Sequence, residues 1–301
     1  MIKGIPYYLW PSLELTRLRG TEFFPPIPDD CGALRTLCLG SKTRTIGDAL
    51  VLTTIPGKLK ARHPELKIFT LPRGFNRAVF YGNPHVSGVQ YAPTAVYGDD
   101  MNSGGGHLIQ LKEQGLGVPT STLPRPEIFL TRDEMEWGKA KVGEGRRPLV
   151  LIHPWGHTWK RVLDIPGWET LISRWREKFR FWQLGVEGHD RITGCDEHFF
   201  VPPKTRYARQ LFAVMRHARA LVGVNSGPMH VARAFEVPSL ILTEEGDLEA
   251  IFDLRRRFPY FLHGNHVHTF LYEENAHLDV PSSSPDGLRR AFDGFLEGVL
   301  E

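Results

Sequence analysis

Short runs of apolar residues recur along the chain, and Gly, Pro, Asn or Asp residues bound most of them. Runs of this length with turn residues at both ends are typical of buried β-strands. The strands predicted from them span residues 34–39, 66–72, 86–93, 148–153, 179–185, 198–202, 220–224 and 237–242.

Between these runs the apolar positions follow a helical spacing. The last predicted helix, over residues 285–300, is amphipathic through Leu288, Phe292, Phe295 and Val299. Strands that alternate with helices in this way predict an α/β fold with parallel sheets and helices on both faces. The other predicted helices span residues 47–59, 75–80, 107–113, 132–142, 168–178 and 206–219, and one more begins near residue 229.

The length of the chain, 301 residues, indicates two domains, and its 41% hydrophobic content is enough for two sizeable cores. The composition shifts to polar and charged residues before the strand at 148–153, which places the domain boundary near residue 145. We predict an N-terminal extension at 1–32, a first Rossmann-like domain at 33–145, a second at 146–284 and a C-terminal helix at 285–301.

The net charge of +3 and the pI near 8.7 are mildly basic. This balance fits a phosphate-bearing ligand or loose contact with an anionic membrane surface, and it falls short of a nucleic-acid-binding protein. The three cysteines, Cys31, Cys38 and Cys195, lack zinc-type spacing and agree with a reducing compartment. Without a signal peptide or a run of ~18 to 20 apolar residues, we predict a cytoplasmic protein with at most peripheral contact with the inner membrane.

Two classes of cofactor are disfavoured by the motifs. His263, His266 and His268 lie close together, but no carboxylate stands at a matching helical offset, so we predict no metal site there. The turn after the first strand reads SKTRTIGD and lacks the G-x-G-x-x-G pattern of a dinucleotide-binding dehydrogenase. We predict no bound cofactor.

The stretch from Gly223 to Leu242 predicts a strand, a tight turn, a helix and a second strand. The first turn of a helix presents unpaired N–H groups and partial positive charge, which suits a phosphate. Ser226 can cap the helix, Gly227 allows a ligand to approach the backbone, and Pro228 suits the first helical position. The alternative is a plain βαβ connection without a ligand.

Asp48 follows the first strand and lies at the start of the next helix. In open α/β sheets the carboxyl ends of the strands form the edge where ligands bind. Asp48 is therefore a candidate functional residue, although an N-terminal cap is a common alternative role for an aspartate at this place.

Three segments resemble a known family: RTIGDALVLTTIPGKLKARHP, IHPWGHTWKRVLDIPGWETLI and VGVNSGPMHVARAFEVPSLIL. Together they resemble glycosyltransferase family 9, the ADP-heptose:lipopolysaccharide heptosyltransferases. The resemblance covers roughly residues 34–242. It implies a GT-B architecture in which two Rossmann-like domains face a cleft, with the acceptor bound by the first domain and the nucleotide-sugar donor by the second.

The resemblance also implies roles for particular residues. Asp48 takes the place of the family's general base, with Gly47 beside it on the acceptor side. Lys160, or Arg161 as the alternative, corresponds to the lysine that contacts the diphosphate. The residues implied in donor binding are Thr158, Lys160, Glu187, Asn225, Ser226, Gly227, Met229 and His230.

The sequence departs from the family at Asn225, where an aspartate is usual, in the extension before the first strand, and after residue 243. An asparagine keeps hydrogen bonding at this position but loses the charge-assisted bonds of a carboxylate. The resemblance implies an inverting, metal-independent transfer of heptose or a similar sugar from an ADP-linked donor to lipopolysaccharide or another glycan. The alternatives are a non-catalytic nucleotide-sugar-binding protein and a nucleotide-sugar epimerase.

Overall fold

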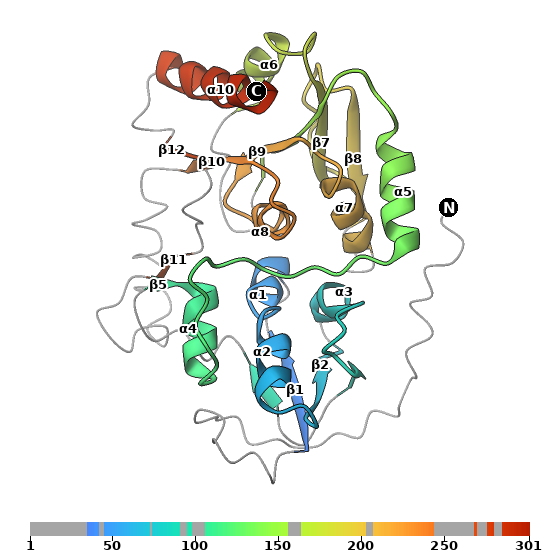
Figure 1. Ribbon diagram of the computed structural model, residues 1–301. Coiled ribbons are helices and arrows are strands. Elements are labelled where there is room, and N and C mark those ends of the chain that lie inside the picture. The colour runs from blue at the N-terminus through green and yellow to red at the C-terminus, as the bar shows by residue number, and fades with distance from the viewer. Residues whose placement is uncertain are drawn as a thin grey trace. The chain divides into compact units, whose positions relative to one another are not determined.

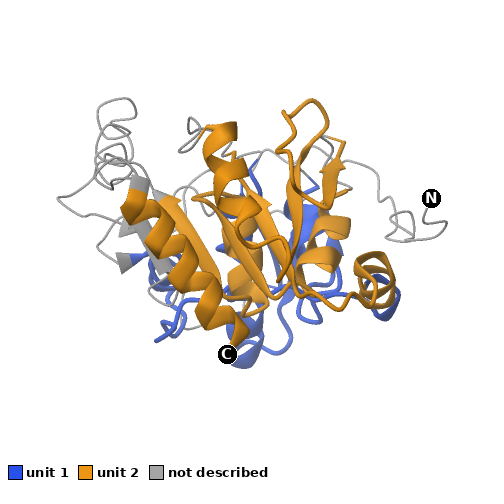
Figure 2. Ribbon diagram, turned by 90° about the horizontal axis from the view of Figure 1, so that it is seen from above, with its two compact units in different colours: residues 1–134, 263–270 blue, residues 135–262, 271–301 orange. Residues whose placement is uncertain are grey.

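The computed structural model describes residues 35–41, 45–72, 74–90, 95–97, 106–155, 164–202, 207–243, 268–269, 276–279 and 285–301. The chain divides into two compact units, coloured blue and orange in Figure 2. Unit 1 comprises residues 1–134 and 263–270, and unit 2 comprises residues 135–262 and 271–301. The predicted N-terminal extension at 1–32 lies outside the described residues.

Unit 1 contains a parallel sheet with the strand order β3-β2-β1-β4. Leu37 of β1 pairs with Ile68 of β2, and the two side chains are fully buried. A separate parallel pair joins β5 to β11. The strands are β1 (Thr36–Gly40), β2 (Lys67–Thr70), β3 (Gly88–Val89), β4 (Ala95–Tyr97), β5 (Gly106–His107) and β11 (His268–Thr269), and the helices are α1 (Ile46–Leu50), α2 (Ile55–Arg62), α3 (Asn76–Phe80) and α4 (Leu108–Gly115).

The helix predicted from residue 47 through residue 59 is in fact two helices, α1 and α2. Pro56 stands in the first turn of α2 and cannot donate a backbone hydrogen bond to the preceding turn, so a new helix starts there. The strand predicted at 86–93 is assigned only at Gly88–Val89, and β4 and the β5-β11 pair were not predicted. His107 caps α4 by accepting the Ile109 N–H at Nδ1, 3.1 Å away.

Unit 2 contains a six-stranded parallel sheet with the order β12-β10-β9-β6-β7-β8 (Figure 1). The predicted α/β class and parallel pairing are confirmed. The strands are β6 (Leu149–His153), β7 (Arg180–Val186), β8 (Glu197–Val201), β9 (Ala220–Val224), β10 (Ser239–Thr243) and β12 (Ala276–Asp279), and the helices are α5 (Arg132–Val142, which begins in unit 1), α6 (Ile165–Ser173), α7 (Ala208–Met215), α8 (Gly227–Ala234) and α10 (Pro285–Leu300).

Helices cover both faces of this sheet. Trp168 of α6 and Phe292 of α10 pack with Phe181 of β7 in one buried cluster. On the opposite face, Lys141 of α5 lies 5.4 Å from the ring centroid of Trp182, the next residue along β7. The side chains of neighbouring strand residues point to opposite faces, so β7 is covered from both sides.

Gly138 of α5 packs closely against α7. A methyl group at Gly138 would come within 2.4 Å of the Ala213 carbonyl oxygen. We expect Gly138→Ala to destabilise unit 2 by ~1–3 kcal/mol, because the two helices must move apart. Gly294→Ala in α10 is the matched control, because nothing lies within 4 Å of its added methyl group.

Thermal unfolding of the two variants measures the difference. Gly294→Ala should stabilise the protein by up to about 1 kcal/mol, because alanine favours a helix. Equal or higher stability of Gly138→Ala would show that α5 is not held this closely against α7.

No helix among the described residues is long and apolar enough to cross a membrane.

Candidate functional site

The turns at the carboxyl ends of β6, β7 and β9 carry the residues of the candidate donor site in unit 2. His153 ends β6, Glu187 follows β7, and Asn225 and Ser226 follow β9. The parallel pairing brings these ends to one edge of the sheet, which is the edge where α/β folds bind ligands.

Ser226 occupies the N-cap position of α8, but its side chain makes no capping hydrogen bond. The prediction that the Ser226 side chain caps α8 is therefore wrong. The hydroxyl instead donates to the Val224 carbonyl oxygen at 3.1 Å and lies 3.0 Å from Nδ1 of His153. The Ser226 hydroxyl is thus directed back toward the strands.

The first turn of α8 also keeps one backbone donor available. Among the residues that the structure describes, the Gly227 N–H has no hydrogen-bond partner. Pro228 has no N–H, and the Met229 N–H donates to the Ser226 carbonyl oxygen at 3.0 Å. An anion at this helix end would meet an available backbone donor and the positive end of the helix dipole.

His153 was not identified from the sequence. Burial lowers the pKa of this histidine to about 3, and His189 nearby lowers it further, so the imidazole is neutral at neutral pH. A methyl group at Gly223 would lie 3.0 Å from the His153 carbonyl oxygen, so a larger residue would require β6 or β9 to shift slightly. The sequence signal that could have identified His153 is its position as a polar residue at the end of an otherwise apolar strand.

Aromatic rings line the ends of β6 and β7. The rings of Trp155 and His189 are 4.6 Å apart and inclined at 46°, and Phe200 of β8 lies edge-on to His189 at 6.3 Å. Glu187 is exposed beside them, and its N–H donates to the Val201 carbonyl oxygen at 3.1 Å. Flat apolar surface next to an exposed carboxylate suits the base and the ribose of a nucleotide.

The remaining predicted donor residues differ in exposure. Asn225 is half-buried at the end of β9. The side chains of Met229 and His230 are buried at 0% and 3% exposure, so a contact with a donor through Met229 would have to come from its backbone. Thr158 and Lys160 lie outside the described residues, as does Arg161.

Asp48 lies in unit 1, in the first turn of α1. Thr45 is the N-cap of this helix, so the alternative that Asp48 itself caps it is wrong. The Thr45 hydroxyl donates to Oδ2 of Asp48, and the Asp48 N–H points back to the Thr45 hydroxyl oxygen at 3.5 Å. This pairing holds the half-buried carboxylate at the start of α1, close to the carboxyl end of β1 and next to the half-buried Gly47.

Asn76 of α3 was also not identified from the sequence. Its side chain binds the backbone of Ser41, the residue that follows β1 in the segment leading to Asp48. Its Oδ1 accepts the Ser41 N–H at 2.8 Å, and its Nδ2 donates to the Ser41 carbonyl oxygen at 2.9 Å. Asn76 is fully buried, and a methyl group at Gly40 would lie 2.9 Å from its Oδ1. A buried amide with both ends bonded gives this turn one conformation.

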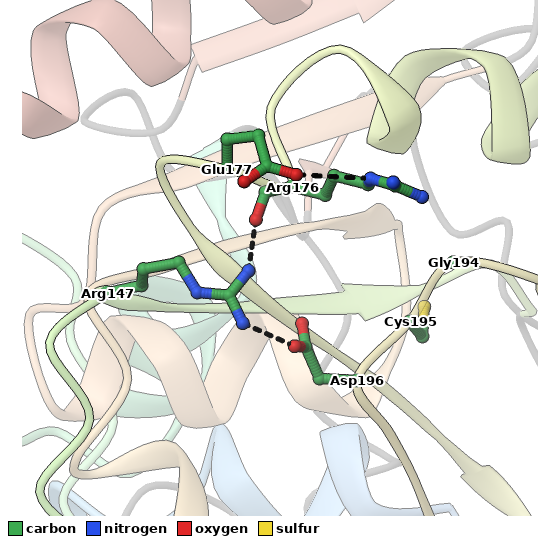
Figure 3. Close-up of a pocket in the computed structure, with 6 residues that line it drawn as sticks. All are labelled: Arg147, Arg176, Glu177, Gly194, Cys195 and Asp196. Carbon is green, nitrogen blue, oxygen red and sulfur yellow. Dashed lines mark hydrogen bonds and ion pairs between the residues drawn. The ribbon is translucent and has the colours of Figure 1, made fainter.

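A pocket of about 270 Å³ lies at the opposite edge of the unit 2 sheet, where β6, β7 and β8 begin (Figure 3). The Arg147 guanidinium donates to the Asp196 carboxylate at 2.7 Å and to the Arg176 carbonyl oxygen. The charges of Arg147 and Asp196 therefore link the chain segments that precede β6, β7 and β8. Burial raises the pKa of the Cys195 thiol to about 12, with Asp196 and Glu169 adding to the shift. The thiol is therefore protonated and unreactive, and we place the functional site at the carboxyl edge instead.

Within the described residues, no group of three or more His, Cys, Asp or Glu side chains is arranged to hold a metal ion. Of the clustered histidines, His263 and His266 lie outside the described residues, and His268 belongs to β11.

Residues 109–245 match the model of glycosyltransferase family 9 (heptosyltransferase). The matched segment includes the candidate donor site of unit 2, whereas Asp48 precedes it. Among curated proteins, none matches this chain.

Several solved structures share the fold. E. coli heptosyltransferase WaaC with ADP is 11% identical with a TM-score of 0.61, covering 88% of this chain and 100% of its own. E. coli ADP-heptose lps heptosyltransferase II is 13% identical with a TM-score of 0.53, covering 89% and 100%. The iron-containing dodecameric glycosyltransferase TibC of enterotoxigenic E. coli is 14% identical with a TM-score of 0.55, covering 88% and 76%.

These similarities define the class of fold: the chain has the GT-B fold of these glycosyltransferases, consistent with two Rossmann-like domains. The match over residues 109–245 agrees with the predicted resemblance to glycosyltransferase family 9 for that part of the chain.

Proposed function

We propose that the protein transfers heptose or a similar sugar from an ADP-linked donor to lipopolysaccharide or another glycan, with inversion at the anomeric carbon and without a metal ion. The observation that carries the proposal is the open first turn of α8 within the segment that matches the family. Supporting it, two similar structures are complexes with ADP-heptose or ADP.

In the proposed reaction an acceptor hydroxyl oxygen attacks the anomeric carbon of the donor sugar. The bond from that carbon to the diphosphate oxygen breaks, and the electron pair leaves with the nucleoside diphosphate. Asp48 takes the proton of the attacking hydroxyl, so that the acceptor and the anionic donor yield the glycoside, the nucleoside diphosphate with one more negative charge, and one proton. Attack from the side opposite the leaving group inverts the anomeric configuration.

The growing negative charge of the diphosphate requires fixed donors. We assign this role to the first turn of α8, with its available Gly227 N–H. Lys160, or Arg161 as the alternative, supplies a cation, and these charges take the place of a metal ion. Glu187 lies beside the nucleoside, and Asn225 offers an uncharged amide near the donor sugar.

A thermal-shift panel of ADP, UDP and GDP, run with and without EDTA, tests the donor assignment. A ligand at 100 times its dissociation constant stabilises the folded protein by roughly 2.7 kcal/mol. We expect ADP to raise the melting temperature in both buffers and UDP and GDP to have little effect. A response to UDP or GDP alone would refute the adenine assignment, and loss of the ADP response in EDTA would refute metal independence.

Incubation with an ADP-sugar separates the proposal from its two alternatives. Transfer to a glycan acceptor supports the proposal. An isomerised donor in the absence of acceptor would identify an epimerase, and binding without any conversion would identify a non-catalytic binding protein.

A further inference from the structure

We propose that Gln183 is a positioning residue that fixes the segment 187–192 at the nucleoside end of the donor site. This segment follows β7 and carries Glu187 and His189. The inference rests on the proposed function, because it concerns the same donor site. It gives a fully buried polar side chain of unit 2 a role in nucleotide binding.

The Gln183 side chain binds the backbone of this segment through both ends of its amide. Its Nε2 donates to the Asp190 carbonyl oxygen at 2.8 Å, and its Oε1 accepts the Ile192 N–H at 2.8 Å. A buried amide is costly unless it is hydrogen-bonded, and both partners here belong to the segment. An apolar residue of similar size could fill the same place in the core, but it could not hold the segment.

His198 of β8 holds the same segment from the neighbouring strand. It is the register partner of Gln183, so the two side chains share one face of the sheet. Its Nε2 lies 3.1 Å from the Ile192 carbonyl oxygen, which can only accept, so this nitrogen donates. The Ile192 side chain is fully buried in the core cluster that contains Trp168 and Phe181. The carboxyl end of the segment is thus fixed by three hydrogen bonds and one buried side chain.

The amino end of the segment forms a turn. The His189 N–H donates to the Val186 carbonyl oxygen at 3.1 Å, and Gly188 has a φ of 97°, the positive value that the third position of a type II turn requires. Glu187 is exposed in this turn. The His189 ring lies close against β7, because a methyl group at Gly185 would come within 2.9 Å of its Nδ1.

Loss of the Gln183 amide would release Asp190 and, with it, the turn that precedes it. His189 is the residue before Asp190, and its ring would lose its fixed place 4.6 Å from the Trp155 ring. A site that is correctly formed only part of the time binds its ligand more weakly by that fraction. The effect should therefore fall on nucleotide affinity.

Isothermal titration of the full chain with ADP tests this role. We expect Gln183→Leu to weaken ADP binding by about fivefold to tenfold, the factor that corresponds to one hydrogen bond of ordinary strength. His198→Phe keeps a ring but removes the bond to Ile192, and it should weaken binding by about twofold to fivefold. In both variants the backbone amides of residues 187–192 should exchange faster by mass spectrometry, while β6 and β9 stay protected.

Asp293→Ala is the matched control for a general loss of stability in unit 2. Asp293 of α10 accepts hydrogen bonds from Trp175 at 2.6 Å and from Arg174 at 2.9 Å, and both donors precede β7 at the opposite edge of the sheet. This variant should melt at a lower temperature but bind ADP within about twofold of the unmutated protein. An equal loss of ADP affinity in Asp293→Ala would indicate a general structural effect and overturn the proposal.

Unchanged ADP affinity in Gln183→Leu would refute the positioning role alone and leave the donor site in place. Weaker binding without faster exchange over residues 187–192 would also overturn the proposal, because the loss would not arise in that segment. If Gln183→Leu does not fold, His198→Phe decides by the same criteria. If UDP or GDP binds in place of ADP, the titrations are made with that nucleotide. If the unmutated protein binds none of the three, the proposed donor site itself fails and this inference fails with it.

Discussion

Replacing Asp48 with asparagine is expected to lower turnover by about 10² to 10⁴-fold while affinity for ADP stays within about twofold. An amide of the same shape cannot take the proton of the acceptor hydroxyl. Because Asp48 belongs to unit 1 and the diphosphate donors belong to α8 of unit 2, loss of the base should leave donor binding intact. Initial-rate kinetics on a transferable acceptor, together with ADP titration, measure the two effects separately.

Asp133→Asn is the matched control for Asp48→Asn. Asp133 is also an aspartate in the first turn of a helix, α5, but it is exposed. Its replacement should leave turnover unchanged within about twofold. Normal turnover of Asp48→Asn on the true acceptor would remove Asp48 from the mechanism, and equal losses of turnover and ADP affinity would indicate a structural role instead.

Replacing Glu113 with alanine is expected to destabilise unit 1 by ~3–5 kcal/mol, the usual cost of breaking a buried ion pair. The Glu113 carboxylate is fully buried and lies 2.6 Å from Nζ of Lys58. It also accepts hydrogen bonds from the Thr54 hydroxyl at 2.7 Å and from the Ser121 N–H at 2.6 Å. Its removal leaves these donors without their acceptor and Lys58 without its counter-charge.

Hydrogen exchange of backbone amides, read by mass spectrometry, locates this effect. Amides of α2 and α4 should exchange faster in Glu113→Ala, because Lys58 lies in α2 and Glu113 in α4, while the strands of unit 2 stay protected. Glu65→Ala, at an exposed position of the same unit, is the control and should change stability by no more than about 0.5 kcal/mol. Unchanged protection in Glu113→Ala would mean that the buried network contributes little.

Much of the fold could be predicted because local patterns and tertiary packing agree. The helix α5 has its predicted bounds, since Thr131 and Glu134 form a capping box: the Thr131 N–H donates to Glu134 at 2.9 Å and the Glu134 N–H donates to Thr131 at 3.2 Å. The helix α6 starts at Ile165, earlier than the apolar spacing indicated, because Asp164 caps it by accepting the Gly167 N–H at 2.8 Å.

Parts of the candidate site could not be predicted, because they depend on contacts between distant segments. Ser226 and His153 are separated by 73 positions, and nothing in the local sequence indicates that the strand order places β6 beside β9. The same holds for Asn76 and Ser41, which are 35 positions apart. Without those contacts, the ordinary expectation for Ser226 was a capping bond.

By itself the sequence determined the class of fold, the turn of Asn225 and Ser226 that precedes α8, and the likeness to glycosyltransferase family 9, because strand periodicity, turn residues and motif spacing are local properties of the chain. Only the tertiary structure decided which neighbours these residues have. It directs the Ser226 hydroxyl to His153, because the parallel register of β6 and β9 brings the two side chains to the same edge of the sheet.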